Sequence, residues 1–239
     1  MNCINSINKI NYQDYKLFFK GDKSLLDKPK IAIVGTRKPN QYSKLITAKL
    51  SNLLSNKFVI VSGGAMGIDA IAHSNAKQTI MVSPSGLDVI YPKTNKSLIE
   101  NIAKNHLIIT EYENNYKPRP YSFVQRNRIV VDICEFIIII EADEKSGSIR
   151  SAEFAEKFNK KIYTIPHRIG ESKGTTKLVL ENKAEFILDI ENFINDLDIK
   201  QGTEILDFNE ALRIYGDKLY EMELDGSVKI ENGKVYISH

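Results

Sequence analysis

The sequence contains no tryptophan, only two cysteines and no long apolar run in its 239 residues. The longest apolar stretch, Phe136 to Ile140, is far shorter than the roughly 20 residues that a membrane-spanning helix needs. Cys3 and Cys134 cannot build a disulfide framework, and the first residues, MNCINSINKI, lack the apolar segment of a secretory signal. These absences predict a cytoplasmic protein with no membrane partner.

The sequence also lacks the patterns that carry catalysis or bind metal. No Cys/His cluster has metal-ligand spacing. His73 and His167 lie nearest to the glycine-containing turns, but neither has a paired acid or nucleophile at motif spacing. We expect His73 to pack on its own helix. The sequence therefore predicts no catalytic residue, no metal and no cofactor.

The net charge of +3 is small, but the charge is unevenly distributed. Residues 1–60 carry eleven lysines and arginines against three acids, whereas residues 201–239 carry eight acids against four basic residues. A basic first quarter favours a polyanionic partner, although scattered surface lysines are the commoner explanation of such a count.

Apolar runs alternate with amphipathic segments along residues 28–197. The runs at 30–35, 58–62, 79–83, 107–111, 136–142 and 161–166 are expected to be strands. The segments at 42–56, 67–77, 94–105, 122–134 and 147–159 have apolar residues at helical spacing. Continuous apolar strands separated by helices predict an α/β domain, a Rossmann-like doubly wound parallel sheet. Residues 1–27 are expected to be a short N-terminal extension.

The C-terminal part has a different pattern. Residues 198–203 are expected to be a linker, and residues 204–239 predict two short helices, an Asp-Gly turn and a hairpin closed by Asn232-Gly233. This order is the outline of a small winged-helix-like domain. A winged helix that reads DNA needs a basic recognition helix, so the acidic tail predicts a protein-contact module.

Residues 58–69, FVIVSGGAMGID, predict a strand, a glycine turn and a helix start. Main chain without a Cβ approaches a ligand closely, and helix N–H groups aimed at such a turn favour phosphate. A dinucleotide fingerprint belongs after the first strand of its unit, whereas this turn follows the second. The alternative is a structural one, in which the glycines allow tight helix–sheet packing.

Further cations follow other strands. Arg37 follows the first strand and suits phosphate binding, or an ion pair with a neighbouring loop. Residues 117–128, KPRPYSFVQRNR, combine cations with aromatic rings, as single-stranded nucleic acid requires. Arg126 and Arg128 are two apart on a helix and point to different faces, so one of them could pair with Glu111 or Asp132. Phe123 could equally be a core residue.

A second strand–turn–helix segment lies at residues 141–148. Lys145 adds positive charge there, and Ser146 and Ser148 add hydroxyl groups, next to Gly147 at the helix start. Ser148 could instead be a simple N-cap.

Together these strings resemble one family, the DprA (Smf) DNA-processing proteins. The matching segments, over residues 17–190, are LFFKGD, IAIVGTR, VSGGAMGIDAIAH, GLDVIYPKTN, TEY, FVQRNRIV, EADEKSGSIRSAEFA, YTIP and SKGT. The resemblance implies a non-enzymatic recombination mediator that binds single-stranded DNA and loads RecA onto it during natural transformation. It also implies a homodimer that uses no nucleotide or metal.

The resemblance assigns DNA binding to residues at each of these segments. They are Arg37, Ser62, Gly63, Gly64, Gly67, Phe123, Arg126, Asn127, Arg128, Lys145, Ser146, Gly147 and Ser148. Arg119 joins this set of predicted DNA-binding residues as a cation of the segment 117–128. The apolar stretch 186–197 is a candidate dimer surface.

Two other functions compete with this one. A phosphoribohydrolase of the lysine-decarboxylase-like (LOG) family would cleave nucleoside monophosphates with a glutamate in PGGxGTxxE; the motif is absent here, although Glu153 follows Ser148 by five residues. A nucleotide-sensing Rossmann domain with a regulatory winged helix is the third hypothesis.

Overall fold

The computed structural model describes residues 8–201, 203–231 and 233–238. The chain divides into two compact units between Leu188 and Asp189. Each unit has its own hydrophobic core, so each is described separately.

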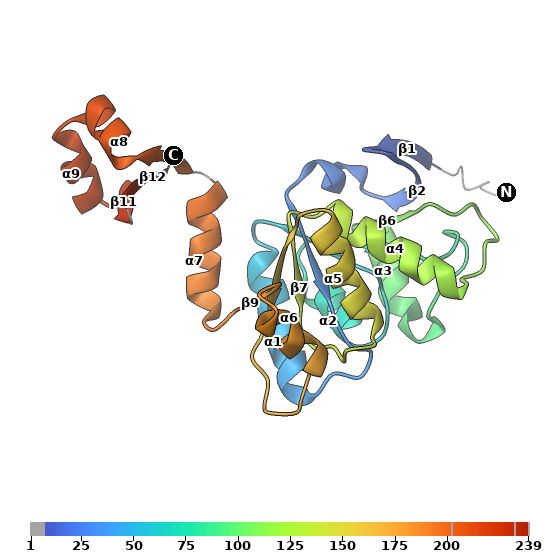
Figure 1. Ribbon diagram of the computed structural model, residues 1–239. Coiled ribbons are helices and arrows are strands. Elements are labelled where there is room, and N and C mark those ends of the chain that lie inside the picture. The colour runs from blue at the N-terminus through green and yellow to red at the C-terminus, as the bar shows by residue number, and fades with distance from the viewer. Residues whose placement is uncertain (1–7, 202, 232, 239) are drawn as a thin grey trace. The chain divides into compact units, whose positions relative to one another are not determined.

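The first unit is built on a nine-stranded sheet with the strand order β1-β2-β6-β5-β4-β3-β7-β8-β9 (Figure 1). Its parallel part comprises β3 (Lys30–Val34), β4 (Val59–Ser62), β5 (Thr79–Val82), β6 (Leu107–Thr110), β7 (Phe136–Ile139), β8 (Lys161–Thr164) and β9 (Glu185–Phe186). The six strands predicted from the sequence are all present, and the doubly wound α/β fold is confirmed.

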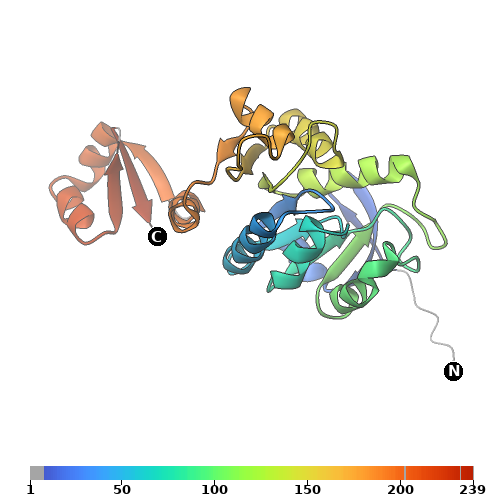
Figure 2. The same cartoon turned by 90° about the horizontal axis from the view of Figure 1, so that it is seen from below.

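The helices lie on both faces of the sheet (Figure 2). They are α1 (Gln41–Leu54), α2 (Ile68–Asn75), α3 (Lys96–Asn105), α4 (Pro120–Asp132), α5 (Gly147–Lys157) and α6 (Lys173–Leu180), with short 3-10 turns at Lys23–Asp27 and Lys93–Asn95. α1, α2 and α3 pack together on one face, and α4 and α5 pack together on the other. The sheet is therefore covered on both sides, which explains its continuous apolar strands.

The core follows the two-residue period of the strands. Ala32 and Val34 of β3 belong to the large core beneath α4 and α5, together with Ile137 and Ile139 of β7. Met81 and Ile108, on the opposite side of their strands, pack under α3 with Ile99 and Ile102. Both faces of the central strands are buried, so one-residue slips of register are strongly disfavoured.

Residues 8–21 form part of the sheet, whereas the sequence predicts that residues 1–27 are a short extension that precedes the domain. β1 (Asn8–Tyr12) and β2 (Tyr15–Gly21) form an antiparallel hairpin, and β2 pairs with β6. Tyr15 and Leu17 are buried, and the Tyr15 hydroxyl donates to Asp132 at 2.5 Å. Phe18, the neighbour of Leu17 on the other face of the strand, is buried as well, so β2 is covered on both faces in its middle.

The second unit is small. It contains α7 (Ile190–Gln201), β10 (Thr203–Asp207), α8 (Phe208–Tyr215), α9 (Lys218–Leu224), β11 (Val228–Glu231) and β12 (Lys234–Ser238). The two expected helices and the hairpin are present. A further strand, β10, is not predicted by the sequence and pairs with β12. The end of α7 and the start of β10 occupy most of the linker that the sequence predicts at 198–203. Its core is formed by Leu206, Ala211, Leu219, Val228, Val235 and Ile237.

Two absences hold for the described part of the chain. None of its helices is both long enough and apolar enough to span a membrane. Within the same residues, no group of three or more His, Cys, Asp or Glu side chains could hold a metal ion.

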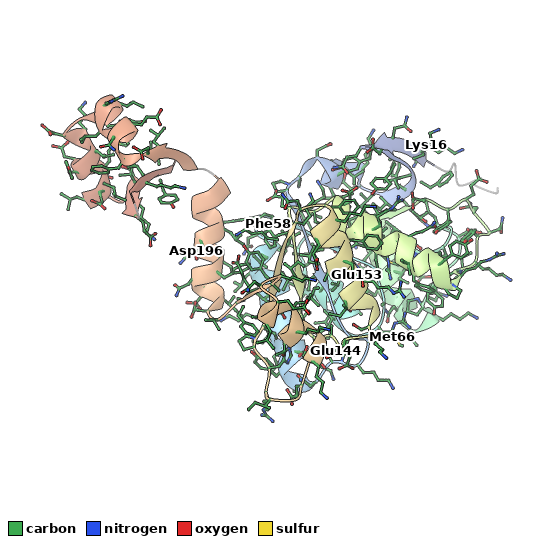
Figure 3. The ribbon with its side chains drawn as sticks, in the orientation of Figure 1. Lys16, Phe58, Met66, Glu144, Glu153 and Asp196 are labelled. Atoms are coloured by element: carbon green, nitrogen blue, oxygen red, sulfur yellow. The ribbon has the colours of Figure 1, made fainter. Side chains whose placement is uncertain are left out.

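The hairpin provides a stability test. Leu17 is 1% exposed, so Leu17→Ala should lower the free energy of unfolding by about 2 to 5 kcal/mol, through lost burial and the cavity left behind. Lys16 is its matched control, because its side chain points to solvent on the same strand (Figure 3). Lys16→Ala should change the free energy by less than about 0.5 kcal/mol. Urea unfolding measures both, and equal effects would contradict the placement of β2.

Candidate nucleic-acid interface

A cleft lies where the carboxyl ends of β3, β4 and β7 meet. The chain leaves β3 towards α1 on one face and leaves β7 towards α5 on the other, so the cleft sits at the switch point of the sheet. Its walls come from the loop after β3, the glycine turn, α4 and the start of α5. They include Arg37, Gly63, Asp69, Phe123, Arg126, Asn127, Glu141, Asp143, Ser146, Gly147 and Ser148. The structure therefore brings most of the predicted site residues together.

The glycine turn between β4 and α2 packs closely on the loop after β3. Gly67 has a φ of +78°, and a Cβ built on it would lie 2.4 Å from the carbonyl oxygen of Thr36. The N–H of Ile68 donates to the same oxygen at 3.1 Å. Only glycine combines this conformation with such a close approach. The structural reading of the glycines thus holds for Gly67.

The turn already holds an internal anion. The N–H groups of Gly63 and Ala65 donate to one carboxylate oxygen of Asp69, at 3.2 and 3.3 Å. Burial raises the pKa of Asp69, and the charge of Arg126 and these hydrogen bonds act against that rise. Among the residues that the structure describes, the N–H groups of Gly64, Met66 and Gly67 have no hydrogen-bond partner. These three are the donors that the turn can offer to a phosphate.

Ser62 is fully buried at the end of β4. Its hydroxyl donates to the carbonyl oxygen of Ile33 at 2.7 Å, which ties β4 to β3. The hydroxyl of Ser62 is therefore committed to the sheet.

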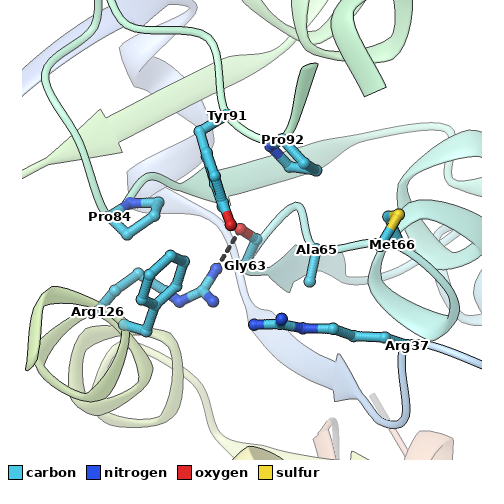
Figure 4. Close-up of a pocket in the computed structure, with 9 residues that line it drawn as sticks. Arg37, Gly63, Ala65, Met66, Pro84, Tyr91, Pro92 and Arg126 are labelled. Carbon is cyan, nitrogen blue, oxygen red and sulfur yellow. Dashed lines mark hydrogen bonds between the residues drawn. The ribbon is translucent and has the colours of Figure 1, made fainter. Parts of the chain in front are cut away.

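Arg126 is buried in the wall of the cleft, with 6% of its surface exposed. Its guanidinium donates to the carbonyl oxygen of Gly63 (Figure 4). It also donates to the carbonyl oxygen of Val82, and its Nε donates to Asn127 Oδ1 at 2.9 Å. Burial lowers the pKa of Arg126, and the charge of Asp69 opposes that shift. Arg126 therefore connects α4 to the glycine turn.

Arg37 is an exposed cation of the cleft, next to the exposed Lys38. Its guanidinium lies 5.9 Å from the ring centroid of Phe123, and the side chain reaches into the pocket opposite Arg126 (Figure 4). Within the described part of the chain, Arg37 forms no hydrogen bond or ion pair through its side chain. The alternative of an ion pair with a neighbouring loop is not found there. The guanidinium is thus available for phosphate.

Phe123 faces the cleft and is not a core residue. Its ring packs against Tyr91, with centroids 5.4 Å apart and planes tilted by 60°. Pro84 and Pro92 complete the apolar side of this inner pocket, and Met66 lies at its edge (Figure 4). Tyr91 is not among the site residues predicted from the sequence, although it stands in the motif GLDVIYPKTN.

Arg128 and Arg119 lie outside the cleft. Arg128 forms an ion pair with Glu111 at 2.9 Å and stacks over the ring of Tyr15 at 5.0 Å. This geometry confirms that Arg126 and Arg128 point to different faces of the helix and that one of them pairs with Glu111. Arg119 is exposed at the N-cap of α4.

The second turn contributes the N-terminus of α5. Ser146, not Ser148, is the N-cap, because its side chain accepts from the N–H of Ile149 at 3.4 Å. Asn127 donates to the carbonyl oxygen of Gly147 at 3.2 Å and so fixes α5 against α4. Lys145 is exposed and directly precedes Ser146, which lines the cleft. Ser148 is buried.

Two acids in the cleft were not predicted. Glu141 and Asp143 follow β7 and line the cleft, and the carboxylate of Glu141 reaches the loop after β3, where it accepts from the N–H of Asn40 at 3.1 Å. No sequence pattern distinguishes these two acids from acidic residues elsewhere on the protein surface. Glu153 lies on the exposed side of α5 and belongs to a different surface hollow, so the cleft gives no support to the phosphoribohydrolase hypothesis.

His73 is buried on α2, as expected. Its Nδ1 lies 2.6 Å from the hydroxyl oxygen of Thr79, and burial lowers its pKa to about 3. The imidazole is therefore neutral at physiological pH.

Comparisons with known proteins agree on one family. The family model described as DNA recombination-mediator protein A matches residues 4–198. DNA processing protein DprA of Streptococcus pneumoniae is 40% identical over 171 residues, which are 69% of this chain and 61% of that protein. DNA processing protein DprA of Bacillus subtilis is 36% identical over 189 residues, 76% of this chain and 63% of that protein. The chain thus matches less than two thirds of the length of either relative.

Two solved structures share the fold. The structure of DNA processing protein A from Helicobacter pylori, described for its unique single-stranded DNA binding mode, has a TM-score of 0.78 and 44% identity. It matches 80% of this chain and 95% of that chain. The X-ray structure of the Streptococcus pneumoniae protein has a TM-score of 0.75 and 34% identity, over 80% of this chain and 74% of that chain.

The contact between Arg126 and the glycine turn can be tested through stability. A Cβ built on Gly63 would lie 1.6 Å from the Arg126 guanidinium, so Gly63→Ala should lower the free energy of unfolding by about 2 to 3 kcal/mol. Gly147 is the matched control, because its Cβ would meet no atom within 4 Å. Gly147→Ala should stay within about 1 kcal/mol of the parent in urea unfolding. A neutral Gly63→Ala would show that Arg126 is not held as described.

Proposed function

Because the chain belongs to the DNA recombination-mediator protein A family, we propose that it binds single-stranded DNA in the cleft between α2, α4 and α5. The observation that carries this proposal is the exposed Arg37 guanidinium over the ring of Phe123, beside three unpartnered main-chain N–H groups. Cations and main-chain N–H groups bind phosphates, and an aromatic ring stacks on a base.

The inner pocket is suited to one base. Phe123 and Tyr91 offer ring faces, and Pro84 and Pro92 offer apolar contact, while Arg37 stands at the pocket entrance. Neighbouring phosphates would then lie within reach of Arg37 and of the N–H groups of the glycine turn. The relative from Helicobacter pylori, described for its single-stranded DNA binding mode, supports this choice of ligand.

We further propose that the protein acts in the cytoplasm as a recombination mediator that loads RecA on incoming single strands during natural transformation, without catalysis or cofactor. The family description as a recombination mediator supports this role. We also propose a homodimer that uses residues 186–197, since Phe186 and Leu188 expose 38% and 81% of their surfaces.

The second unit is proposed to be a winged-helix-like protein-contact module. Its residues 201–239 carry eight acids against four basic residues, which disfavours contact with a polyanion.

The role of Arg37 predicts a specific change in DNA affinity. Arg37→Ala should weaken binding of oligo-dT by about tenfold and reduce the slope of log K against log[salt] by about 0.7, the share of one phosphate contact on a single strand. Lys104→Ala is the control, because Lys104 is exposed at the C-terminal end of α3, next to the amino end of β6 and so at the edge of the sheet opposite the cleft. Titrations at two salt concentrations measure both values. Unchanged affinity after Arg37→Ala would contradict the assignment of the cleft.

The mediator role predicts an effect on RecA that follows DNA binding. The parent protein should shorten the lag of RecA filament formation on single strands already coated by a single-strand-binding protein. Arg37→Ala should restore the lag in proportion to its lost affinity. A parent that binds oligo-dT but leaves the lag unchanged would rule out RecA loading and leave the DNA site intact.

A further inference from the structure

Three tyrosines form an exposed cluster outside the cleft, between β6 and the first turn of α4. The rings of Tyr112 and Tyr116 are stacked, with centroids 4.1 Å apart and planes 8° from parallel. The hydroxyl of Tyr116 donates to that of Tyr121 at 2.5 Å, and the hydroxyl of Tyr112 donates to Gln125 at 2.6 Å. Tyr121 exposes 49% of its surface. We call Tyr112, Tyr116 and Tyr121 the tyrosine surface.

The tyrosine surface is held in place by its backbone. The N–H of Asn115 donates to both carboxylate oxygens of Asp88, at 2.9 and 3.0 Å. The carbonyl oxygen of Tyr116 accepts from the N–H of Gly86 at 3.0 Å. The rings are thus fixed before any ligand arrives, which lowers the entropy lost on binding.

The surroundings of the tyrosine surface favour an anionic ligand. Lys117 and Arg119 are exposed on the same segment, and neither forms an ion pair with another described residue. Of the three acids there, Glu111 is paired with Arg128, Asp88 accepts from the N–H of Asn115, and Glu113 is exposed. Two cations beside flat, rigid rings suit phosphates and bases of a single strand better than an apolar protein segment.

The tyrosine surface is joined to the cleft through two elements. Tyr121 and Phe123 both stand in the first turn of α4, and Phe123 contacts Tyr91 inside the cleft. Tyr91 follows closely on Gly86 and Asp88, which fix the tyrosine loop. A strand that leaves the pocket at Tyr91, which exposes 37% of its surface, meets this loop next.

We propose that the tyrosine surface is a second stacking subsite, which takes bases of the DNA strand as they leave the cleft. This inference rests on the proposed function, because it assumes that a single strand occupies the cleft. Lys117 and Arg119 bind the phosphates that flank the stacked bases. The subsite adds length to the bound strand and does not read its sequence, because any base presents a face to a ring.

The test compares oligonucleotides of two lengths. Tyr116→Leu removes the ring and keeps the apolar bulk, so it should weaken binding of an oligo-dT of about 20 nucleotides by about tenfold, the value of one base–aromatic stack. It should leave binding of an oligo-dT of about 6 nucleotides, which fills only the cleft, unchanged. Tyr220→Leu, at an exposed tyrosine of the second unit, is the matched control.

The outcomes separate this inference from the proposed function. If the parent binds neither length, the proposed function fails. If the parent binds both and Tyr116→Leu weakens both equally or neither, the subsite is overturned and the cleft assignment stands. Because the chain has no tryptophan, Tyr116→Trp supplies a single fluorescent reporter. The longer oligonucleotide should quench its emission and the shorter one should not; quenching by RecA alone would overturn the subsite in favour of a protein contact.

Discussion

The shape of the cleft depends on the buried hydrogen bond from the guanidinium of Arg126 to the carbonyl oxygen of Gly63. A cation withdrawn from water costs several kcal/mol unless charges and polar groups surround it. Here the carbonyl oxygens of Gly63 and Val82 and the negative charge of Asp69 compensate that cost. Since Arg126 stands on α4 and Gly63 on the turn before α2, this contact fixes the separation of two walls. Asn127 bonds both to Arg126 and to Gly147 and so extends the constraint to α5.

Arg37 and Arg126 therefore lie in different environments, although the sequence assigns both to the same candidate site. Arg126 donates to protein oxygens through its Nε and one terminal nitrogen, and these bonds tie α4 to the glycine turn. Arg37 keeps its guanidinium in solvent, where an incoming phosphate is its strongest partner. The same contrast applies to the glycine turn. Two of its N–H groups donate to the carboxylate of Asp69, and the N–H groups without a protein partner are available to water or to a phosphate.

The sequence predicts those features of the fold and the site that depend on local periodicity. Continuous apolar strands and helical spacing give the sheet, and the 100° step of a helix separates Arg126 from Arg128. Burial is decided by tertiary contact, so the sequence could not show that Arg126 is covered, that Ser62 bonds to β3, or that an acid in the first turn of α2 folds back into the glycine turn. The hairpin at residues 8–21 escaped prediction for a related reason. The run YKLFFKG has no clean alternation of apolar and polar residues, and β2 pairs with β6, which lies far along the chain.

The charges inside the cleft are mixed. Arg37 and Lys38 follow β3 and line the cleft, and the carboxylate of Glu141 accepts from the N–H of Asn40 on the same loop, so this acid lies beside the cations and not on the opposite wall. Asp69 and Asp143 line the cleft as well. Carboxylates repel phosphate, so a strand in the proposed site would meet separate cations and N–H groups among acids, and not a continuous basic surface. A site of this kind depends on the exact position of each donor, which is why the contacts that hold α4 against the glycine turn matter more to it than the net charge of the chain.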